Sequence, residues 1–233
     1  MGRRSTTVFL VAAFAAGQTN LYGDLFAMRR DAMVRETIEN RQVTDPATLR
    51  AMRAVERHRF VLPELIGNAY DDRPLPIGFG QTISQPYIVA LMTELLQVNE
   101  DSVVLEIGAG SGYQAAVLAE IVNRVYTIEI VPELADLSAN RMKELGYENV
   151  VVKEGDGYFG WEEHAPFDGI IVTAAATHIP PPLIEQLKPG GRLVIPVGPP
   201  MQVQNLMLIE KTEDGEIRQR SLMPVRFVPF TRR

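Results

Sequence analysis

A short apolar segment that runs straight into a glycine-rich loop is the feature that most constrains the fold of this chain. Residues 103–107 read Val-Val-Leu-Glu-Ile, and Gly108, Gly110 and Gly112 follow at alternate positions. The apolar run predicts a buried strand, and the periodic segment over 114–122 predicts a helix directly after the loop. Glycines in such a strand–loop–helix turn let the backbone bend tightly and let a ligand approach without meeting a Cβ atom.

The same alternation of strand and helix continues along the chain. Four further apolar runs predict strands, at residues 125–130, 150–153, 168–173 and 192–197. Helices are expected between them over 132–145 and around 183–187, and Asp214-Gly215 predicts a terminal β-hairpin. Repeated strand–helix units imply a parallel sheet with helices on both faces. The expected fold is therefore α/β, a doubly wound, mostly parallel sheet with an antiparallel C-terminal hairpin.

Composition narrows the chemistry that this fold can carry. The 233 residues fit one domain, and 46% hydrophobic with 22% charged residues is ordinary for a globular protein. The chain has no cysteine, which excludes disulfides, thiolate metal sites and cysteine nucleophiles. Its three histidines lack the spacing of metal ligands, so no metal site is expected. A net charge of −6 argues against a nucleic-acid partner.

The N-terminal 26 residues are set apart from the domain. Arg3 and Arg4 precede an apolar run over 8–16, which is the layout of a secretory signal peptide and too short for a helix that spans a bilayer. Two alternatives are an unstructured extension and a true start at Met28. In each case the folded domain is expected over 27–233.

Acidic residues lie at or directly after the ends of two predicted strands. Glu129 ends the second predicted strand about 20 residues after the glycine loop, where a carboxylate can accept hydrogen bonds from both ribose hydroxyls. Asp156 follows the third strand in a Gly-Asp-Gly turn. The dinucleotide pattern G-x-G-x-x-G would require a third glycine at position 113, but this residue is Tyr113. The loop therefore favours a nucleoside ligand other than a dinucleotide.

The spacing G-x-G-x-G with an acidic residue two positions before it resembles motif I of the class I methyltransferases, which have a Rossmann-like fold. That resemblance implies S-adenosylmethionine as cofactor, held by Glu106, Gly108, Ala109, Gly110, Ser111 and Gly112 around its amino-acid portion. It also implies that Asp156 contacts the adenine amino group and that Gly157 admits the ring. The fourth strand continues into Ala174-Ala175-Ala176, not the Asn/Asp-Pro-Pro-aromatic motif of amino-group methyltransferases, so the acceptor is expected to be an oxygen nucleophile.

Stretches outside this loop resemble the protein-L-isoaspartate O-methyltransferases. The longest is Pro-Ile-Gly-Phe-Gly-Gln-Thr-Ile-Ser-Gln-Pro over 76–86, and others lie at residues 57–61, 173–176, 187–193 and 225–231. The resemblance runs from about residue 27 to the end, and one departure is Gln85, where the family more often has alanine. It implies methyl transfer from S-adenosylmethionine to the free α-carboxyl of L-isoaspartyl residues in damaged proteins. Residues 27–98 would form a helical, substrate-binding part and residues 99–233 the cofactor-binding sheet.

Residue by residue, the resemblance makes Ser84 the catalytic residue. Ser84 precedes a helix that begins near Pro86, so its hydroxyl and the N–H groups of the first turn would form an anion site for the acceptor carboxylate. The alternative is that Ser84 only caps this helix. The same matching adds further cofactor contacts at Gln81, Thr82, Ile83, Ser84, Val89, Ile130 and Thr231.

The expected partners are isoaspartyl peptides and proteins, without nucleic acid or stable membrane association, and the chain is expected to be a monomer. The cytoplasm is the expected compartment because S-adenosylmethionine is made there, with the periplasm as the alternative if the signal-like segment acts. Two other functions stay open. One is a class I O-methyltransferase acting on a small oxygen nucleophile, and the other is a module that binds the cofactor without turnover. An NAD-dependent oxidoreductase is disfavoured by Tyr113.

Overall fold

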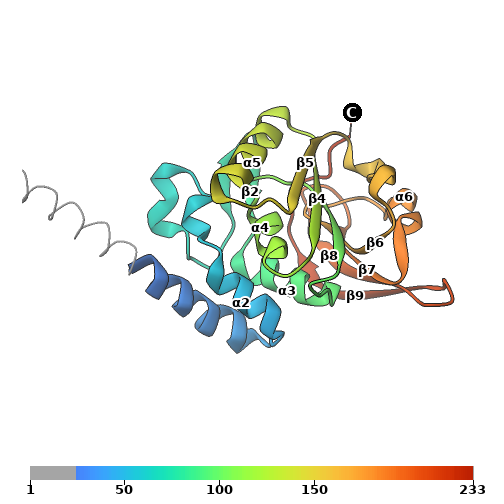
Figure 1. Cartoon of the computed structure of the whole chain (residues 1–233), viewed down its shortest axis with the longest axis horizontal. Coiled ribbons are helices and arrows are strands. Elements are labelled where there is room, and N and C mark those ends of the chain that lie inside the picture. The colour runs from blue at the N-terminus through green and yellow to red at the C-terminus, as the bar shows by residue number, and fades with distance from the viewer. Residues whose placement is uncertain (1–24, 233) are drawn as a thin grey trace, which may run out of the picture.

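A seven-stranded sheet forms the centre of the computed structural model, which describes residues 25–232 (Figure 1). The strands are β3 (Val103–Ile107), β4 (Arg124–Glu129), β5 (Val150–Glu154), β6 (Phe167–Val172), β7 (Leu187–Val197), β8 (Gln204–Lys211) and β9 (Ile217–Val225). Their order is β5-β4-β3-β6-β7-β8-β9. The first five strands in this order, β5, β4, β3, β6 and β7, are parallel to one another. Strands β8 and β9 follow as an antiparallel hairpin. The expected mostly parallel sheet with a C-terminal hairpin is confirmed.

The central strands β3 and β6 are buried on both faces of the sheet, which explains why they are apolar runs without regular polar alternation. Successive side chains of β3 point to opposite faces, so Val104 joins one core and Leu105 the other. Ile171 and Ile170 on β6 divide in the same way. The carboxyl ends of these strands therefore emerge together at one edge of a rigid layer.

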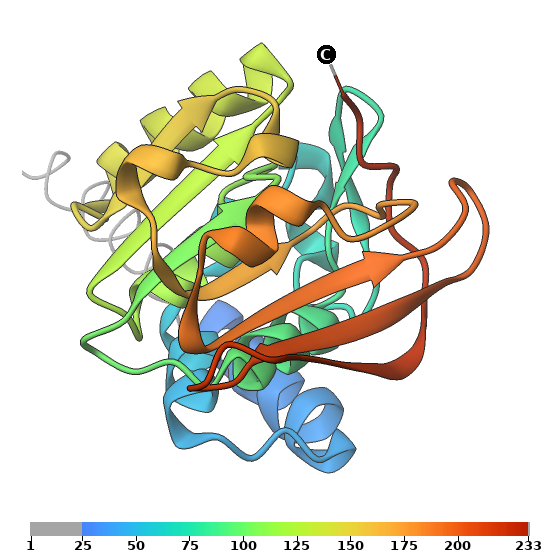
Figure 2. The ribbon, with the colours of Figure 1, turned by 90° about the vertical axis from the view of Figure 1, so that its right-hand side faces the viewer.

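Helices cover the two faces unequally. The larger core packs against α3 (Pro86–Leu96), α4 (Tyr113–Ala119) and α5 (Pro132–Leu145), whereas α6 (Pro181–Glu185) lies on the other face. In Figure 1, α4 and α5 stand to the left of the sheet and α6 to its right. Figure 2 looks onto the face that carries α6. No helix among residues 25–232 is long and apolar enough to cross a membrane.

Proline positions explain where several helices begin. Pro86, Pro132 and Pro181 each occupy the first turn, where a missing N–H leaves no hydrogen bond unmade. Two boundaries differ from expectation. Helix α4 ends at Ala119, and β7 begins at Leu187, before the Pro-Gly-Gly segment that was expected to separate helix from strand. Leu187 pairs with Phe167 before a register shift, so the sheet continues through a sequence typical of a turn.

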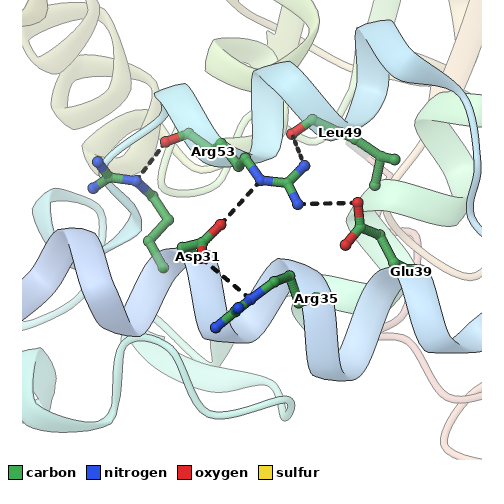
Figure 3. Close-up of polar contacts among 6 residues, drawn as sticks. Asp31, Arg35, Glu39, Leu49 and Arg53 are labelled. Atoms are coloured by element: carbon green, nitrogen blue, oxygen red, sulfur yellow. Dashed lines mark hydrogen bonds and ion pairs between the residues drawn. The ribbon is translucent and has the colours of Figure 1, made fainter.

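The N-terminal part of the described chain forms a layer of helices beneath α3. Residues 25–33 are α-helical and continue into η1 (Val34–Ile38) and η2 (Glu39–Arg41), and α2 (Pro46–Ala54) follows after Asp45 caps its first turn. Figure 3 shows how α2 is tied to the first helix. Arg53 pairs with Asp31 at 3.2 Å and with Glu39 at 2.9 Å, in a partly exposed network that fixes orientation more than it adds stability.

Short elements connect α2 to α3. Two 3-10 turns, η3 (Arg57–Arg59) and η4 (Pro63–Asn68), precede a small antiparallel hairpin of β1 (Leu75–Gly78) and β2 (Gln81–Ile83). The hairpin turns through Phe79, which has a positive φ of 52°. Its strands are only four and three residues long, and β1 contains a proline and a glycine, so no apolar run identifies them in the sequence.

Candidate active site

A cavity opens where the carboxyl ends of β3, β4 and β6 meet. It spans about 780 Å³ when the open space at its mouth is included. Its walls combine segments that lie far apart in the sequence: residues 81–84 and Val89, residues 106–111, Tyr113 and Gln114, residues 128–131, Gly157, Thr173 and Ala174, and residues 228–231. Fourteen of the sixteen residues expected at the cofactor are among them, and Gly112 and Asp156 are the two that are not.

The glycine loop has the shape that its sequence predicts. Gly108 has a φ of +97°, and a Cβ atom there would lie 2.4 Å from the Thr173 hydroxyl oxygen. That hydroxyl donates toward the carbonyl oxygens of Ile107 and Gly108, at 3.0 and 2.7 Å, and so fastens the loop to the end of β6. Gly112 serves packing: a Cβ atom there would meet Met142 of α5 at 2.7 Å. Only the first part of the loop therefore faces the cavity.

Glu129 is held in a single position at the end of β4. One carboxylate oxygen accepts the Gly110 N–H at 2.8 Å, and the other accepts the Val131 N–H at 3.0 Å. The side chain is only 6% exposed and lines the cavity. Each carboxylate oxygen can accept a second hydrogen bond, so the group can still bind two hydroxyls of a ligand.

Glu106 presents a different carboxylate to the same cavity. It is fully buried, and neither of its oxygens has a hydrogen-bond partner among residues 25–232. Burial raises the pKa of Glu106 to about 8; the charge of Glu129 adds to this rise, and the neighbouring Thr127 hydroxyl opposes it. A buried carboxyl group without a partner in a cavity wall suits a ligand cation.

Asp156 and Gly157 occupy separate places. Gly157 lines the cavity, and a Cβ atom there would lie 2.3 Å from Ile107, so only glycine fits. Asp156 accepts the Tyr158 N–H at 3.0 Å and pairs with Arg232 at 2.8 Å. Its expected contact with adenine stays a prediction, since in the structure these groups engage its carboxylate outside the cavity wall.

The chain after β9 returns across the cavity. The Ala175 N–H donates to the Val228 carbonyl oxygen at 2.8 Å, and the Phe230 N–H donates to the Ala175 carbonyl oxygen at 2.9 Å. In Figure 2 this tail (red) rises beside the β1–β2 hairpin (teal), and both segments line the cavity. Of the tail, the sequence analysis assigned only Thr231 to the site. It also missed Thr173, although the position directly after a parallel strand is a signal that could have identified it.

Ser84 lies at the junction of this cavity and a second one. The second cavity encloses about 1000 Å³ including its mouth, and Thr82, Ser84, Thr173 and Val228 line both. The Ser84 hydroxyl makes no hydrogen bond within the described chain, and the N-cap of α3 is Gln85. The alternative that Ser84 is only the helix cap is therefore wrong.

The expected anion site at the start of α3 also needs correction. Pro86 has no N–H, and the Tyr87 N–H donates to the Asp72 carboxylate at 3.0 Å. Because Asp72 already neutralises this end of the helix, the first turn has less to offer an incoming carboxylate than the sequence suggested. The Ser84 hydroxyl is the group that remains available there.

Comparison with known proteins agrees with this geometry. Residues 28–233 match the family model described as protein-L-isoaspartate(D-aspartate) O-methyltransferase (PCMT). A protein-L-isoaspartate O-methyltransferase 2 of Syntrophobacter fumaroxidans is 55% identical, with 99% of each chain covered. A protein-L-isoaspartate O-methyltransferase of Opitutus terrae is 58% identical over 95% of this chain and 91% of its own. A Plasmodium falciparum structure assigned as a PCMT, in complex with S-adenosyl-L-homocysteine, has a TM-score of 0.73 and 26% identity over 87% of this chain and 98% of that chain.

The sheet order, the glycine loop and the carboxylate at the end of β4 define a class I methyltransferase fold. The chain belongs to the protein-L-isoaspartate(D-aspartate) O-methyltransferase family, since the family model and relatives of more than half identity cover nearly all of it.

The raised pKa of Glu106 predicts a pH-dependent stability. The reference pKa of the carboxyl is 4.5 and the folded pKa about 8, so between these values the folded chain holds a proton that the unfolded chain has lost. The free energy of unfolding is therefore expected to fall as the pH rises through this window.

Glu106→Gln should remove this contribution, as measured by urea unfolding from about pH 5 to about pH 8.5 without ligand. Glu144→Gln, at an exposed position on α5, is the control and should keep the wild-type slope. Equal slopes in all three proteins would contradict the prediction.

Proposed function

We propose that this chain transfers a methyl group from S-adenosylmethionine to the free α-carboxyl of L-isoaspartyl residues in damaged peptides and proteins, the first step of their repair. Membership of the family and the names of the relatives support this assignment. The observation that carries it is the position of Ser84, whose unpartnered hydroxyl faces both cavities. One cavity suits a nucleoside cofactor, and the other is large enough for part of a peptide.

The residues of the first cavity fit S-adenosylmethionine. Glu106 is a buried carboxyl group without a partner beside the glycine loop, which suits the ammonium of the amino-acid portion. Glu129 has acceptor capacity for the two ribose hydroxyls. Gly157 leaves space that any side chain would fill, which suits a flat ring. When bound, this cofactor supplies an electrophilic methyl group and leaves as S-adenosylhomocysteine.

The acceptor needs no general base from the protein. An α-carboxyl group has a pKa of about 3.3–3.7, so it is ionised and nucleophilic at neutral pH. The protein must instead orient this carboxylate and remove its water. The Ser84 hydroxyl can donate to one carboxylate oxygen and leave the other free to attack. Residues 228–231, which cover the cavity from the tail, exclude solvent from the reacting atoms.

The expected partners, compartment and oligomeric state belong to the same proposal. Isoaspartyl peptides and proteins are the acceptors, and a cytoplasmic monomer is the form that we propose. We propose the cytoplasm because S-adenosylmethionine is made there. The signal-like segment over residues 8–16, which favours the periplasm, lies outside the described residues.

Methyl transfer to a matched pair of peptides tests the function. The enzyme should transfer labelled methyl groups to a peptide that contains L-isoaspartate and not to the same sequence with aspartate, because only the former exposes an α-carboxyl on a side branch. The measurement is radiolabel in base-labile esters. Transfer only to small carboxylic acids or phenols would overturn the proposal in favour of a small-molecule O-methyltransferase, and cofactor binding without any transfer would indicate a binding module.

The ribose role of Glu129 predicts a loss of cofactor affinity. Glu129→Gln keeps the size of the side chain but replaces one acceptor oxygen, and it should weaken S-adenosylhomocysteine binding by about 1.5–3 kcal/mol, or about ten- to a hundredfold in Kd. Isothermal calorimetry measures the change. Glu133→Gln, on an exposed face in the first turn of α5, should bind as the wild type does. Unchanged affinity in the Glu129 variant would exclude this residue from the ribose site.

The orienting role of Ser84 predicts a kinetic defect. Ser84→Ala should slow methyl transfer about ten- to a hundredfold, the value of one hydrogen bond to a charged group in the transition state, with a smaller change in cofactor affinity. The Tm should stay near that of the wild type because Gln85, not Ser84, occupies the N-cap. Single-turnover rates and Tm should be measured on one preparation. A normal rate per folded molecule would place the acceptor site elsewhere.

A further inference from the structure

The second cavity has a charge opposite to that of the whole chain. Two arginines line it and no acidic side chain does, whereas the protein carries a net charge of −6. Its other lining residues are apolar or neutral and come from both parts of the chain: Pro74, Thr82, Ser84, Gln85, Ile88, Thr173, Val203, Met223, Pro224, Val225, Phe227 and Val228. We refer to this cavity as the acceptor groove.

Arg41 forms one cationic point of the acceptor groove, and its neighbours hold it in place. Its guanidinium pairs with Asp72 at 2.9 Å and lies over the Tyr87 ring at 3.4 Å from the centroid. Asp72 also accepts a hydrogen bond from the Gln85 side chain at 2.8 Å, so the arginine is linked to the residue next to Ser84. The charge of Asp72 offsets that of Arg41, which leaves this pair neutral as a whole.

Arg226 is the second cationic point, and nothing offsets its charge. Its side chain is exposed, and it makes no ion pair or hydrogen bond with any residue of the described chain. Its backbone is well anchored, because the adjacent Phe227 N–H donates to the buried Gln204 side chain at 2.9 Å. Arg226 therefore gives the acceptor groove one excess positive charge on an anchored backbone.

The groove begins where the acceptor carboxylate would lie. Ser84 and Val228 border both cavities, so an isoaspartyl residue at Ser84 would leave its neighbours in the peptide within the groove. Consecutive residues of an extended chain are about 3.3–3.6 Å apart, and a Glu side chain adds further reach. A carboxylate next to the isoaspartyl residue can thus reach the unpaired, exposed guanidinium of Arg226 and accept a charge-assisted hydrogen bond from it.

We propose that Arg226 makes the acceptor groove select isoaspartyl peptides that carry an acidic side chain adjacent to the isoaspartyl residue. The selection is electrostatic and acts on binding of the acceptor. It rests on the proposed function, because it concerns the substrate of that same site.

Peptides that differ by a single charge test the selection. Each contains L-isoaspartate with either Glu or Gln on one side of it, and a second pair places the same residues on the other side. In wild type, kcat/KM should be about two- to fivefold higher for Glu than for Gln in at least one pair, the scale of a partly screened ion pair. The preference should lie in KM and should shrink as salt is raised to about 0.5 M.

Substitutions at Arg226 then test whether its charge causes the preference for Glu over Gln. Arg226→Gln should bring the Glu-to-Gln ratio near one, whereas Arg226→Lys should retain most of it because the charge is kept. Arg218→Gln, at an exposed position on β9 outside the groove, is the matched control and should keep the wild-type ratio. Thermal unfolding of each variant, together with its cofactor affinity, checks that the fold is intact.

The outcomes separate the two proposals. If wild type methylates all the isoaspartyl peptides with equal kcat/KM, or if the ratio survives in Arg226→Gln, the charge selection is wrong and the proposed function stands. If wild type methylates none of them, the proposed function fails and the selection fails with it. A ratio that falls in Arg226→Gln and is retained in Arg226→Lys and Arg218→Gln supports the proposal.

Discussion

The reversal of strand order at β3 is the constraint on which the site depends. From β3 the chain proceeds outward through β4 to β5, then returns to place β6 on the other side of β3. The connections on the two sides of β3 therefore diverge, and a crevice must open above its carboxyl end. The glycine loop, Glu129 and Thr173 follow β3, β4 and β6 at this crevice, and hydrogen bonds across it hold the three strand ends together. The binding site is thus a product of topology before it is a product of any single side chain.

Two segments outside the central strands complete the crevice into a chamber. The β1–β2 hairpin contributes residues 81–84, and the tail contributes residues 228–231 through a ladder of two backbone hydrogen bonds to Ala175. Neither segment has a core of its own. Each relies on the sheet for its position, so the acceptor side of the site is built from the less regular parts of the chain.

Local sequence determined the elements that could be predicted. Strand β3 is apolar because both of its faces are buried, and Pro86 and Pro132 mark helix starts through their fixed backbone geometry. Most of the cofactor site followed from the loop spacing and from the family resemblance. The predictions about the start of α3 failed because they depended on residues that are remote in the sequence. Asp72 caps a helix that begins 14 residues later, and no pattern near Ser84 reveals that this serine is left free. The β1–β2 hairpin was not predicted because its two strands are short and contain no apolar run.

The contribution of residues 228–231 to the chamber has a consequence for biosynthesis. These residues follow β9 in the sequence, and they line the same cavity as the loop after β3. A chain that emerges from the ribosome starting at its N-terminus can form the parallel strands and the glycine loop long before the last wall of the chamber exists. The nucleoside crevice can therefore become an enclosed site only after the residues that follow β9 have been made.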